Sequence, residues 1–493
     1  MSIYQKIQDF VKLAIANGSI EAIDEIYLRN RLLHFLSLSD WSENVQETNL
    51  SDSLEIMDEL LNFALKKGVF KAADTEFYES ALMNFITPLP SKVNHVFWKK
   101  YQQSPESATN YFYDLAKQVN QVKTREIAKN IEYLYPSTYG DLQITINLSK
   151  PEKDPKAIAA AKLIHDNSYP KCALCIENEG FYGNGNKAAR SNHRIVRLEL
   201  NDEKWGFQYS PYAYFNEHSI VLNEKHQPMA IDHRCFSNLM AFLDLFPHYM
   251  IGSNADLPIV GGSILTHDHY QAGRHEFPMA KAALREKISL DKFPEIEVGI
   301  VNWPMSVLRL SSRNSESIVA ASDEILAKWR EYNDLSLSIR AQSSDGTLHH
   351  TITPIARKRG DFYEMDLVLR DNNVSETFPD GIFHPHAELH HIKKENIGLI
   401  EAMGLAILPA RLVPELAEVE KYLLGKENQM DEIHKAWADQ LKATDQFSVE
   451  DVHYKVGQAV GEVFTKVLQD AGVFKDDESG HAGFHNFIDF INS

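Results

Sequence analysis

The chain has 493 residues, a hydrophobic content of 44%, a charged content of 24% and a net charge of −19. These values are typical of a folded globular protein with roughly two to four domains, and they exclude a disordered or fibrous chain. They also exclude the basic surface that broad nucleic-acid binding requires, although local cations can still hold a small anion. The sequence contains no run of about 18 apolar residues, so we predict no membrane span. The segment 1–10 has no apolar signal core, so we expect a cytoplasmic location.

Residues 1–135 have the three- and four-residue apolar spacing of helices. This region contains an internal repeat with an offset of 50 residues, in which FVKLAIANG at 10–18 is echoed by LLNFALKKG at 60–68. Each copy ends in a glycine, which is typical of a helix C-terminus, and a second periodic segment follows it. We predict a duplicated helical hairpin with a packing or oligomerisation role, because the region carries no candidate catalytic residue.

The pattern changes at residue 136, where short alternating segments predict strands. In the first half these are 142–148, 194–200, 207–214, 219–222 and 257–265, with a helix at 232–250. A similar order recurs as strands at 298–301, 307–310, 351–355 and 365–369, with a helix at 315–332. We therefore predict two related α+β halves, 136–280 and 281–412, and a helical C-terminal segment, 413–493.

Cysteine is concentrated in one place. The chain has three cysteines, and two of them form the motif Cys172-Ala-Leu-Cys175, which indicates a metal or redox site more than a disulfide scaffold. With His218 and His267, these two thiolates would complete a tetrahedral zinc site. Four protein ligands leave no open position, so we expect a structural metal. The alternative, that both cysteines are small buried hydrophobic residues, stays open.

The segment 261–271, GGSILTHDHYQ, has the most distinctive combination of residues in the chain. A strand that runs into His267-x-His269 would place both imidazoles on one face, because side chains alternate along a strand. One such pair is weak evidence in a chain with 21 histidines, and His384-x-His386 is a second pair. A structural role is the default interpretation of a single pair, and the cysteine motif upstream favours a site here.

Three further stretches extend this pattern: YGDLQITINLSKPEKDP at 139–155, YPKCALCIENEG at 169–180 and HPHAELHHIKKENIG at 384–398. With 261–271, they resemble the galactose-1-phosphate uridylyltransferases, a branch of the histidine-triad superfamily, and within it the second class, found in Gram-positive bacteria. The resemblance covers essentially the whole chain. It implies two histidine-triad-like half-domains with mostly antiparallel sheets and packed helices, flanked by helical segments, in a homodimer.

The resemblance also implies roles for single residues. His269 falls on the nucleophile of the family. Asp268 stands where the better-known first class has a proline, a departure that fits the second class, and its own role is open. The metal ligands of the family fall on Cys172, Cys175, His218 and His267.

Gln271 falls where the hydrolytic relatives have a third histidine. Moving a nucleotidyl group between two sugar phosphates is a double displacement, and neutral imidazole can attack phosphorus and later leave it. A sugar phosphate leaves as an anion without needing a proton. We therefore expect Gln271 to bind a phosphoryl oxygen and to perform no acid catalysis.

The phosphate groups need cationic or N–H partners. Asn254 lies roughly where the family has a phosphoryl-contacting asparagine, and Ser263 is displaced by one position from the family's serine. The pair Gly261-Gly262 would let the backbone approach a phosphate closely. Among the cations we rank Arg357 and Lys394 first, because they lie beside histidine-rich segments, although a single Lys or Arg is by default a solvated surface residue.

We therefore expect an enzyme that moves UMP from UDP-glucose to galactose-1-phosphate by a ping-pong reaction through a uridylyl-histidine, in galactose catabolism by the Leloir pathway. One alternative is an adenylyl transferase or phosphorylase acting on ADP-sugars or dinucleoside polyphosphates, which competition between uracil and adenine nucleotides would separate. The other is a non-enzymatic, zinc-stabilised nucleotide-binding protein, which has no need of a nucleophile at His269. We expect neither a nucleic-acid nor a membrane partner.

Overall fold

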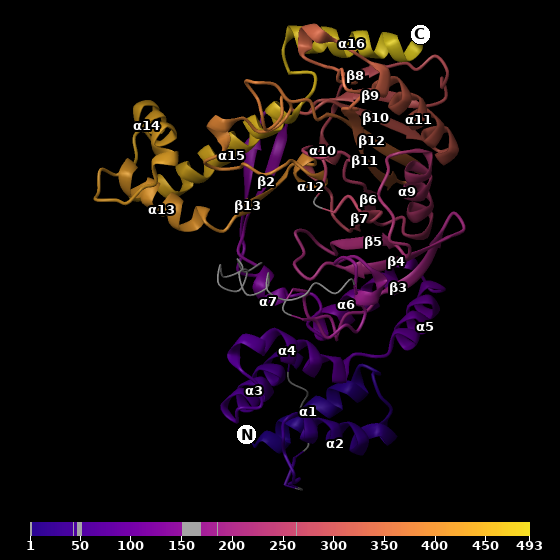
Figure 1. Ribbon diagram of the computed structural model, residues 1–493, viewed down its shortest axis with the longest axis vertical. Coiled ribbons are helices and arrows are strands. Elements are labelled where there is room, and N and C mark those ends of the chain that lie inside the picture. The colour runs from indigo at the N-terminus through magenta and orange to yellow at the C-terminus, as the bar shows by residue number, and fades with distance from the viewer. Residues whose placement is uncertain (1, 43, 47–51, 150–168, 185, 263) are drawn as a thin grey trace. The chain divides into compact units, whose positions relative to one another are not determined.

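The computed structural model describes residues 2–42, 44–46, 52–149, 169–184, 186–262 and 264–493 (Figure 1). The chain divides into two compact units. Unit 1 consists of Met1–Arg125, Pro151–Ala213 and Glu217–Gln227, and unit 2 of Glu126–Lys150, Tyr214–Asn216 and Pro228–Ser493. Within the described ranges, no helix combines the length and the apolar character that crossing a membrane requires.

Unit 1 begins with the two copies of the repeat. The first contains α1 (Ile3–Ala16), the 3-10 helix η1 (Ala22–Asp24) and α2 (Glu25–Phe35); the second contains α3 (Ser53–Lys66), η2 (Ala72–Asp74) and α4 (Thr75–Met83). Gly18 and Gly68 follow the first helix of each copy and both have a φ of 75°, a left-handed conformation that glycine adopts without steric cost. The two copies therefore have the same order of elements and the same helix-ending turn.

The rest of unit 1 is a small sheet covered by helices. Helices α5 (Pro90–Tyr101) and α6 (Pro105–Gln118) accompany the antiparallel strands β3 (Val196–Leu200), β4 (Glu203–Tyr209) and β5 (Ser219–Asn223). The ring of Phe112 on α6 lies 6.1 Å from that of Phe97 on α5 and 5.2 Å from that of Tyr209 on β4. Aromatic packing therefore joins the helices to the sheet. Short helical turns complete the unit or lead out of it: η3 (Asn84–Ile86), α7 (Thr124–Ile127) and η4 (Ile176–Asn178).

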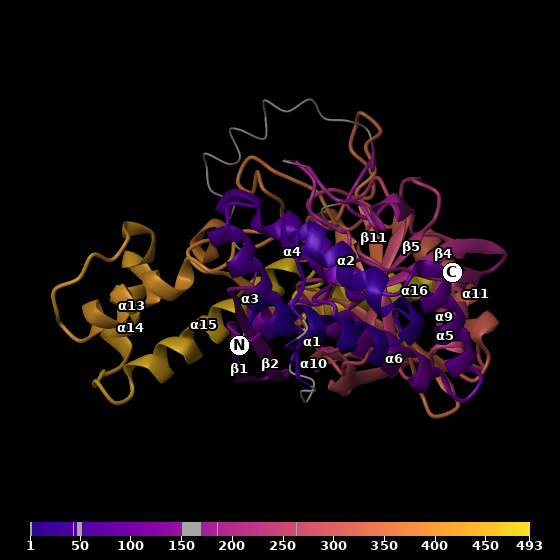
Figure 2. The ribbon, with the colours of Figure 1, turned by 90° about the horizontal axis from the view of Figure 1, so that it is seen from below.

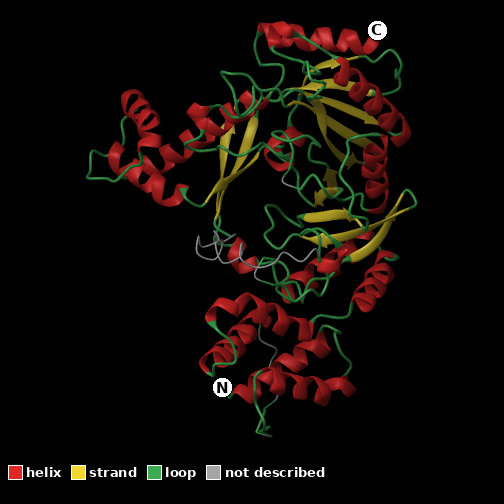
Figure 3. Ribbon diagram, viewed as in Figure 1, coloured by secondary structure: helices red, strands yellow, loops and turns green. Residues whose placement is uncertain are grey.

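Unit 2 is built on antiparallel strands in the order β7, β6, β11, β12, β10, β9, β8. Their bounds are β6 (Met250–Gly252), β7 (His269–Gly273), β8 (Leu284–Ile288), β9 (Glu297–Val301), β10 (Val307–Ser312), β11 (His350–Arg359) and β12 (Phe362–Asp371). Helices α9 (His233–Leu245) and α11 (Ser315–Glu331) lie side by side and pack on β11 (Figures 1 and 3). The apolar faces of these two helices are buried against the sheet, so a ligand would have to contact side chains on the opposite face of the sheet.

The remainder of unit 2 is a second, smaller sheet with C-terminal helices. The hairpin β1 (Ile131–Ser137) and β2 (Gly140–Asn147) pairs through β2 with the parallel strand β13 (Leu405–Pro409). Helices α13 (Leu412–Leu423) and α15 (Val452–Ala471) pack together, and α14 (Lys435–Thr444) packs on α13 (Figure 2). The bounds of the remaining elements are α10 (Pro278–Lys281), η5 (Leu335–Leu337), η6 (Ala387–Leu389), α12 (Leu399–Ala402), η7 (Glu432–His434) and α16 (Glu478–Asn492). Antiparallel sheets with packed helices confirm the predicted α+β class.

The large sheet of unit 2 has an approximate internal two-fold axis. Its two central strands, β6 and β11, pair with each other, and their outer neighbours are β7 and β12. An antiparallel strand pair has a local two-fold axis at each residue pair. A rotation about the one at the middle β6–β11 pair, Ile251 with Ala356, exchanges the two central strands and the two outer ones. Gln271 and Glu364 then become equivalent, because Gln271 pairs with Gly252 and Glu364 pairs with Arg357.

Candidate active site and metal centre

His269 is the first residue of β7, and its buried ring has a fixed orientation. Its Nδ1 lies 2.7 Å from the backbone oxygen of His267. A carbonyl oxygen only accepts hydrogen bonds, so Nδ1–H is the donor and the lone pair of the neutral ring is on Nε2. Burial lowers the pKa of His269 to about 4, against the opposing effect of this hydrogen bond. The ring is therefore neutral at pH 7, with a single nitrogen available as a nucleophile.

The neighbours of His269 anchor the strand to helix α9. The Asp268 carboxylate lies 2.7 Å from the Arg234 guanidinium, and Asn238 donates a 3.2 Å hydrogen bond to the Tyr270 hydroxyl. Both partners are on α9. Because side chains alternate along a strand, His269 is on the face away from this helix. The structure thus assigns Asp268 an anchoring ion pair, which the sequence left open.

The predicted strand at 257–265 is wrong, since the described part of this segment is a loop that turns back on itself. A parallel bridge between Ala255 and Gly261 closes the loop, and Ile259 has a φ of 72°. The apolar run that suggested a strand packs without a partner strand. Only from His269 does the backbone pair as a strand, so His267 precedes it.

The pair Gly261-Gly262 is explained by close backbone packing. A Cβ on Gly261 would lie 2.3 Å from the Ala255 oxygen, and one on Gly262 would lie 2.8 Å from the Asn254 amide nitrogen. The Asn254 amide oxygen accepts a 2.8 Å hydrogen bond from the backbone N–H of Leu399. Asn254 therefore holds this loop to α12. Ser263 lies outside the described residues.

We expect Gly261→Ala to lower the free energy of unfolding by about 1–3 kcal/mol, because backbone atoms must move to admit the new methyl group. Gly457→Ala is the matched control: on α15 a Cβ would meet only Tyr133 atoms at 3.7 Å or more, and helical alanine is favoured over glycine. Urea unfolding of both variants tests this. Equal stability of Gly261→Ala and the wild type would show that the loop has room for a side chain.

The two predicted phosphate-binding cations line different cavities. Arg357 on β11 is buried, and its guanidinium lies 2.8 Å from both the Glu364 and the Asp366 carboxylates. By strand register Arg357 is level with Gly273, roughly 14 Å along β7 from His269. Lys394 is exposed at the rim of a cavity of about 420 Å³. Neither cation is placed at His269 by these contacts.

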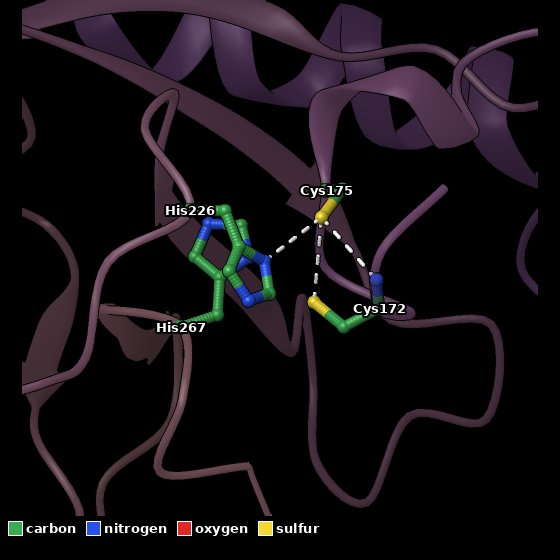
Figure 4. A group of neighbouring side chains, drawn as sticks. All are labelled: Cys172, Cys175, His226 and His267. Carbon is green, nitrogen blue, oxygen red and sulfur yellow. Dashed lines mark hydrogen bonds between the residues drawn. The ribbon is translucent and has the colours of Figure 1, made fainter. Parts of the chain in front are cut away.

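Three side chains of unit 1 form a potential metal centre (Figure 4). The sulfur of Cys175 lies 3.5 Å from that of Cys172 and 3.1 Å from Nδ1 of His226. The ligand atoms of all three are within 4.8 Å of one another. Burial raises the pKa of the Cys175 thiol to about 11, so a bound cation is what would hold this sulfur as a thiolate at neutral pH. Figure 4 also draws His267, which belongs to unit 2.

This group corrects the predicted ligand set in one position, because it contains His226 where we expected His218. His218 immediately precedes β5 and His226 follows it. Four steps of about 3.3 Å separate the two ends of this five-residue strand by roughly 13 Å, and the structure groups the histidine beyond its far end with the cysteines. The ring at the far end, His226, was missed because it belongs to no motif.

A second group of possible metal ligands consists of His386, Glu388 and Asp470, all in unit 2. The Nε2–H of His386 donates a 3.0 Å hydrogen bond to the Ile382 carbonyl, and Nδ1 lies 3.5 Å from the Asp470 carboxylate. The backbone N–H of His386 also donates a 3.0 Å hydrogen bond to the Asp470 carboxylate, so hydrogen bonds account for this geometry without a metal.

The sequence matches two family models. Residues 18–228 match the model described as galactose-1-phosphate uridyl transferase, N-terminal domain, and residues 242–439 match the C-terminal domain model of the same family. The galactose-1-phosphate uridylyltransferase of Lactococcus lactis subsp. lactis (strain IL1403) is 68% identical over 493 residues, which covers 100% of both chains. That of Enterococcus faecalis (strain ATCC 700802 / V583) is 53% identical and covers 99% of this chain and 98% of its own.

Among solved structures, the yeast Ap4A phosphorylase Apa2 is 11% identical to this chain and aligns with a TM-score of 0.30. The alignment covers 57% of this chain and 78% of the phosphorylase. A structural likeness at this level carries no argument about activity.

Proposed function

Since the chain belongs to the galactose-1-phosphate uridylyltransferase family, we propose that it moves UMP from UDP-glucose to galactose-1-phosphate through a covalent bond to His269. The observation that carries this proposal is the buried, neutral ring of His269, whose Nδ1–H is held by the His267 carbonyl. Its free Nε2 is the atom that would attack phosphorus. Relatives of similar length carry the activity in their names, and the match spans the whole chain.

The reaction has two balanced halves. In the first, Nε2 of His269 forms a bond to the α-phosphorus of UDP-glucose, and the bond from that phosphorus to the bridging oxygen breaks, which releases glucose-1-phosphate as an anion. In the second, a phosphate oxygen of galactose-1-phosphate attacks the same phosphorus, and the P–N bond breaks to give UDP-galactose. As the imidazole becomes positively charged, the carbonyl of His267 stabilises it through Nδ1–H.

Gln271 lies two residues beyond His269 on β7 and so on the same face. We propose that its amide binds a phosphoryl oxygen, since neither leaving group needs a proton. Gln271→His should then raise hydrolysis of the uridylylated enzyme relative to transfer, because an imidazole can supply and remove protons. The measurement is the ratio of free UMP to UDP-galactose, with wild type as the control. An unchanged ratio would remove this account of Gln271.

We propose a structural zinc ion held by Cys172, Cys175, His226 and His267. Two thiolates and two imidazoles are the donor set that Zn²⁺ prefers, and four protein ligands exclude substrate from the metal. The family resemblance implies His267 as the fourth ligand. The ion would fix the backbone of His267, whose carbonyl orients the nucleophile.

We further propose that the protein acts as a cytoplasmic homodimer in galactose catabolism by the Leloir pathway, as the family resemblance implies. Sedimentation velocity of the purified protein tests the dimer.

The activity is tested by incubation with UDP-glucose and galactose-1-phosphate and by detection of UDP-galactose and glucose-1-phosphate. Formation of both in equal amounts is the expected result. Turnover of ADP-glucose without turnover of UDP-glucose would instead support the adenine-nucleotide alternative.

A further inference from the structure

Unit 2 contains a cavity of about 320 Å³ that the proposed reaction does not use. It lies at the end of β7 that is opposite His269, between Arg274 and the end of β11, residues 357–359. Apolar side chains that line it include Met250, Phe277 and Met403. This volume is at the lower end of the range for small-molecule sites in proteins.

The lining of the cavity is basic although the chain as a whole carries a charge of −19. Four of its lining residues are Arg or Lys and one is acidic, which gives 4 − 1 = +3 with histidines taken as neutral. Some of this charge is balanced from behind: Arg359 lies 2.8 Å from Glu364 and 3.0 Å from Glu276, and Lys358 lies 3.3 Å from Asp244. With Asp366 on Arg357, these carboxylates offset the positive charge of the lining, so the guanidinium hydrogen-bond donors, more than net charge, favour an anionic occupant.

Arg357 adds a second and independent indication. It is 8% exposed, and its Nε and Nη1 are bound by Glu364 and Asp366, but its buried Nη2 finds no hydrogen-bond acceptor among the described residues. A buried donor without an acceptor costs roughly 1–3 kcal/mol. A guanidinium is suited to phosphate oxygens, which can accept from its nitrogens in pairs.

The internal two-fold axis gives this cavity a counterpart. The rotation that makes Gln271 equivalent to Glu364 also places His269 on Phe362, two residues earlier on each strand. The same rotation places Asn254, which follows β6 in the chain, at the position of Arg359, the last residue of β11. The cationic end of β11 is therefore the second-half equivalent of the loop beside the nucleophile. In the second half a phenylalanine stands in place of the nucleophile and arginines replace Gly252 and Asn254.

We propose that this cavity is a second, non-catalytic binding site for a small phosphorylated metabolite, whose phosphate is held by Arg357 and Arg359, which are on the same face of β11. The apolar part of the lining would contact the remainder of the ligand. Because Phe362 cannot attack phosphorus, the ligand is bound and released unchanged. The comparison of Phe362 with His269 rests on the proposed role of His269 as nucleophile. Binding of a ligand in the cavity does not depend on that role.

Equilibrium dialysis with radiolabelled inorganic phosphate tests the site. The variant Arg359→Gln removes a cation whose side chain is 41% exposed, so folding should survive. We expect its phosphate affinity to fall by about tenfold or more. Lys287→Gln, which removes one exposed charge on β8, is the control and should bind like the wild type. Equal affinity of Arg359→Gln and the wild type would overturn the proposal.

The location is tested separately in crystals soaked with tungstate, a phosphate analogue with a strong anomalous signal. An anomalous peak within hydrogen-bonding distance of Arg357 is the expected result, in the wild type and in His269→Ala alike. Tungstate bound only near His269, or no tungstate at all, would contradict a second site. Failure of uridylyl transfer with a peak still present at Arg357 would count against the proposed function alone.

Discussion

Replacing His269 by alanine is expected to lower the rate of uridylyl transfer by at least about a thousandfold, because removal of a covalent nucleophile leaves only the binding contributions to catalysis. The fold should persist, since among the described residues the side chain forms one hydrogen bond, to the carbonyl of His267 two residues earlier. The assay compares UDP-galactose formation by wild type and variant at matched concentrations.

A second measurement identifies the intermediate. Wild-type protein incubated with UDP-glucose alone should retain a uridylyl group that is labile in acid, and His269→Ala should retain none. His453→Ala is the matched control, since the His453 side chain is 87% exposed on α15 and its ion pair is with Glu420. Transfer by His269→Ala within tenfold of the wild-type rate would mean that the covalent step is on another residue.

Loss of the metal is expected to have the largest effect on stability. We expect Cys172→Ala and Cys175→Ala to abolish binding of one zinc ion per chain and to lower the free energy of unfolding by several kcal/mol, since metal-binding energy is folding energy at a structural site. Cys235→Ala is the control, because Cys235 is buried on α9 and is not in the metal group. Zinc content by mass spectrometry and thermal unfolding are the two measurements.

The histidine ligand has its own matched pair. His226→Ala should lose zinc, and His218→Ala should keep it, because only His226 lies with the two cysteines. The opposite result would restore His218 as the ligand.

Zinc affinity should also fall as the pH falls. Burial holds the pKa of the Cys175 thiol at about 11 without a metal, so this thiol must lose a proton when zinc binds. Acid restores that proton and so weakens binding.

Sequence reasoning found the features that repeat or cluster along the chain. The 50-residue offset marked two hairpins because each copy needs the same apolar face and the same left-handed glycine, Gly18 and Gly68. The Cys172-x-x-Cys175 motif stood out because the chain has one further cysteine. Local patterns of this kind are set by residues close in sequence, so they can be recognised without the fold.

The features that sequence reasoning missed depend on contacts distant in sequence. His226 joins the cysteines through the geometry of β5, and no spacing rule singles it out from His218. The segment 257–265 has the composition of a strand, but close packing of Gly261 on Ala255 turns it into a loop. Substrate binding by Arg357 stays a prediction, but its partners Glu364 and Asp366 come from the neighbouring strand and could not be recognised from the sequence.

The pairing of β2 with β13 has a consequence for synthesis on the ribosome. Gln143 on β2 meets Leu405 on β13, so one edge of the small sheet is translated long before the strand that completes it. At about 5–20 residues per second, the β1–β2 hairpin waits on the order of ten seconds to a minute with an unpaired edge. Unit 1 receives its last segment, Glu217–Gln227, well before that. The nascent chain therefore passes through a period in which its first unit can fold while an early hairpin depends on late synthesis, and a chaperone that covers exposed strand edges would act in that interval.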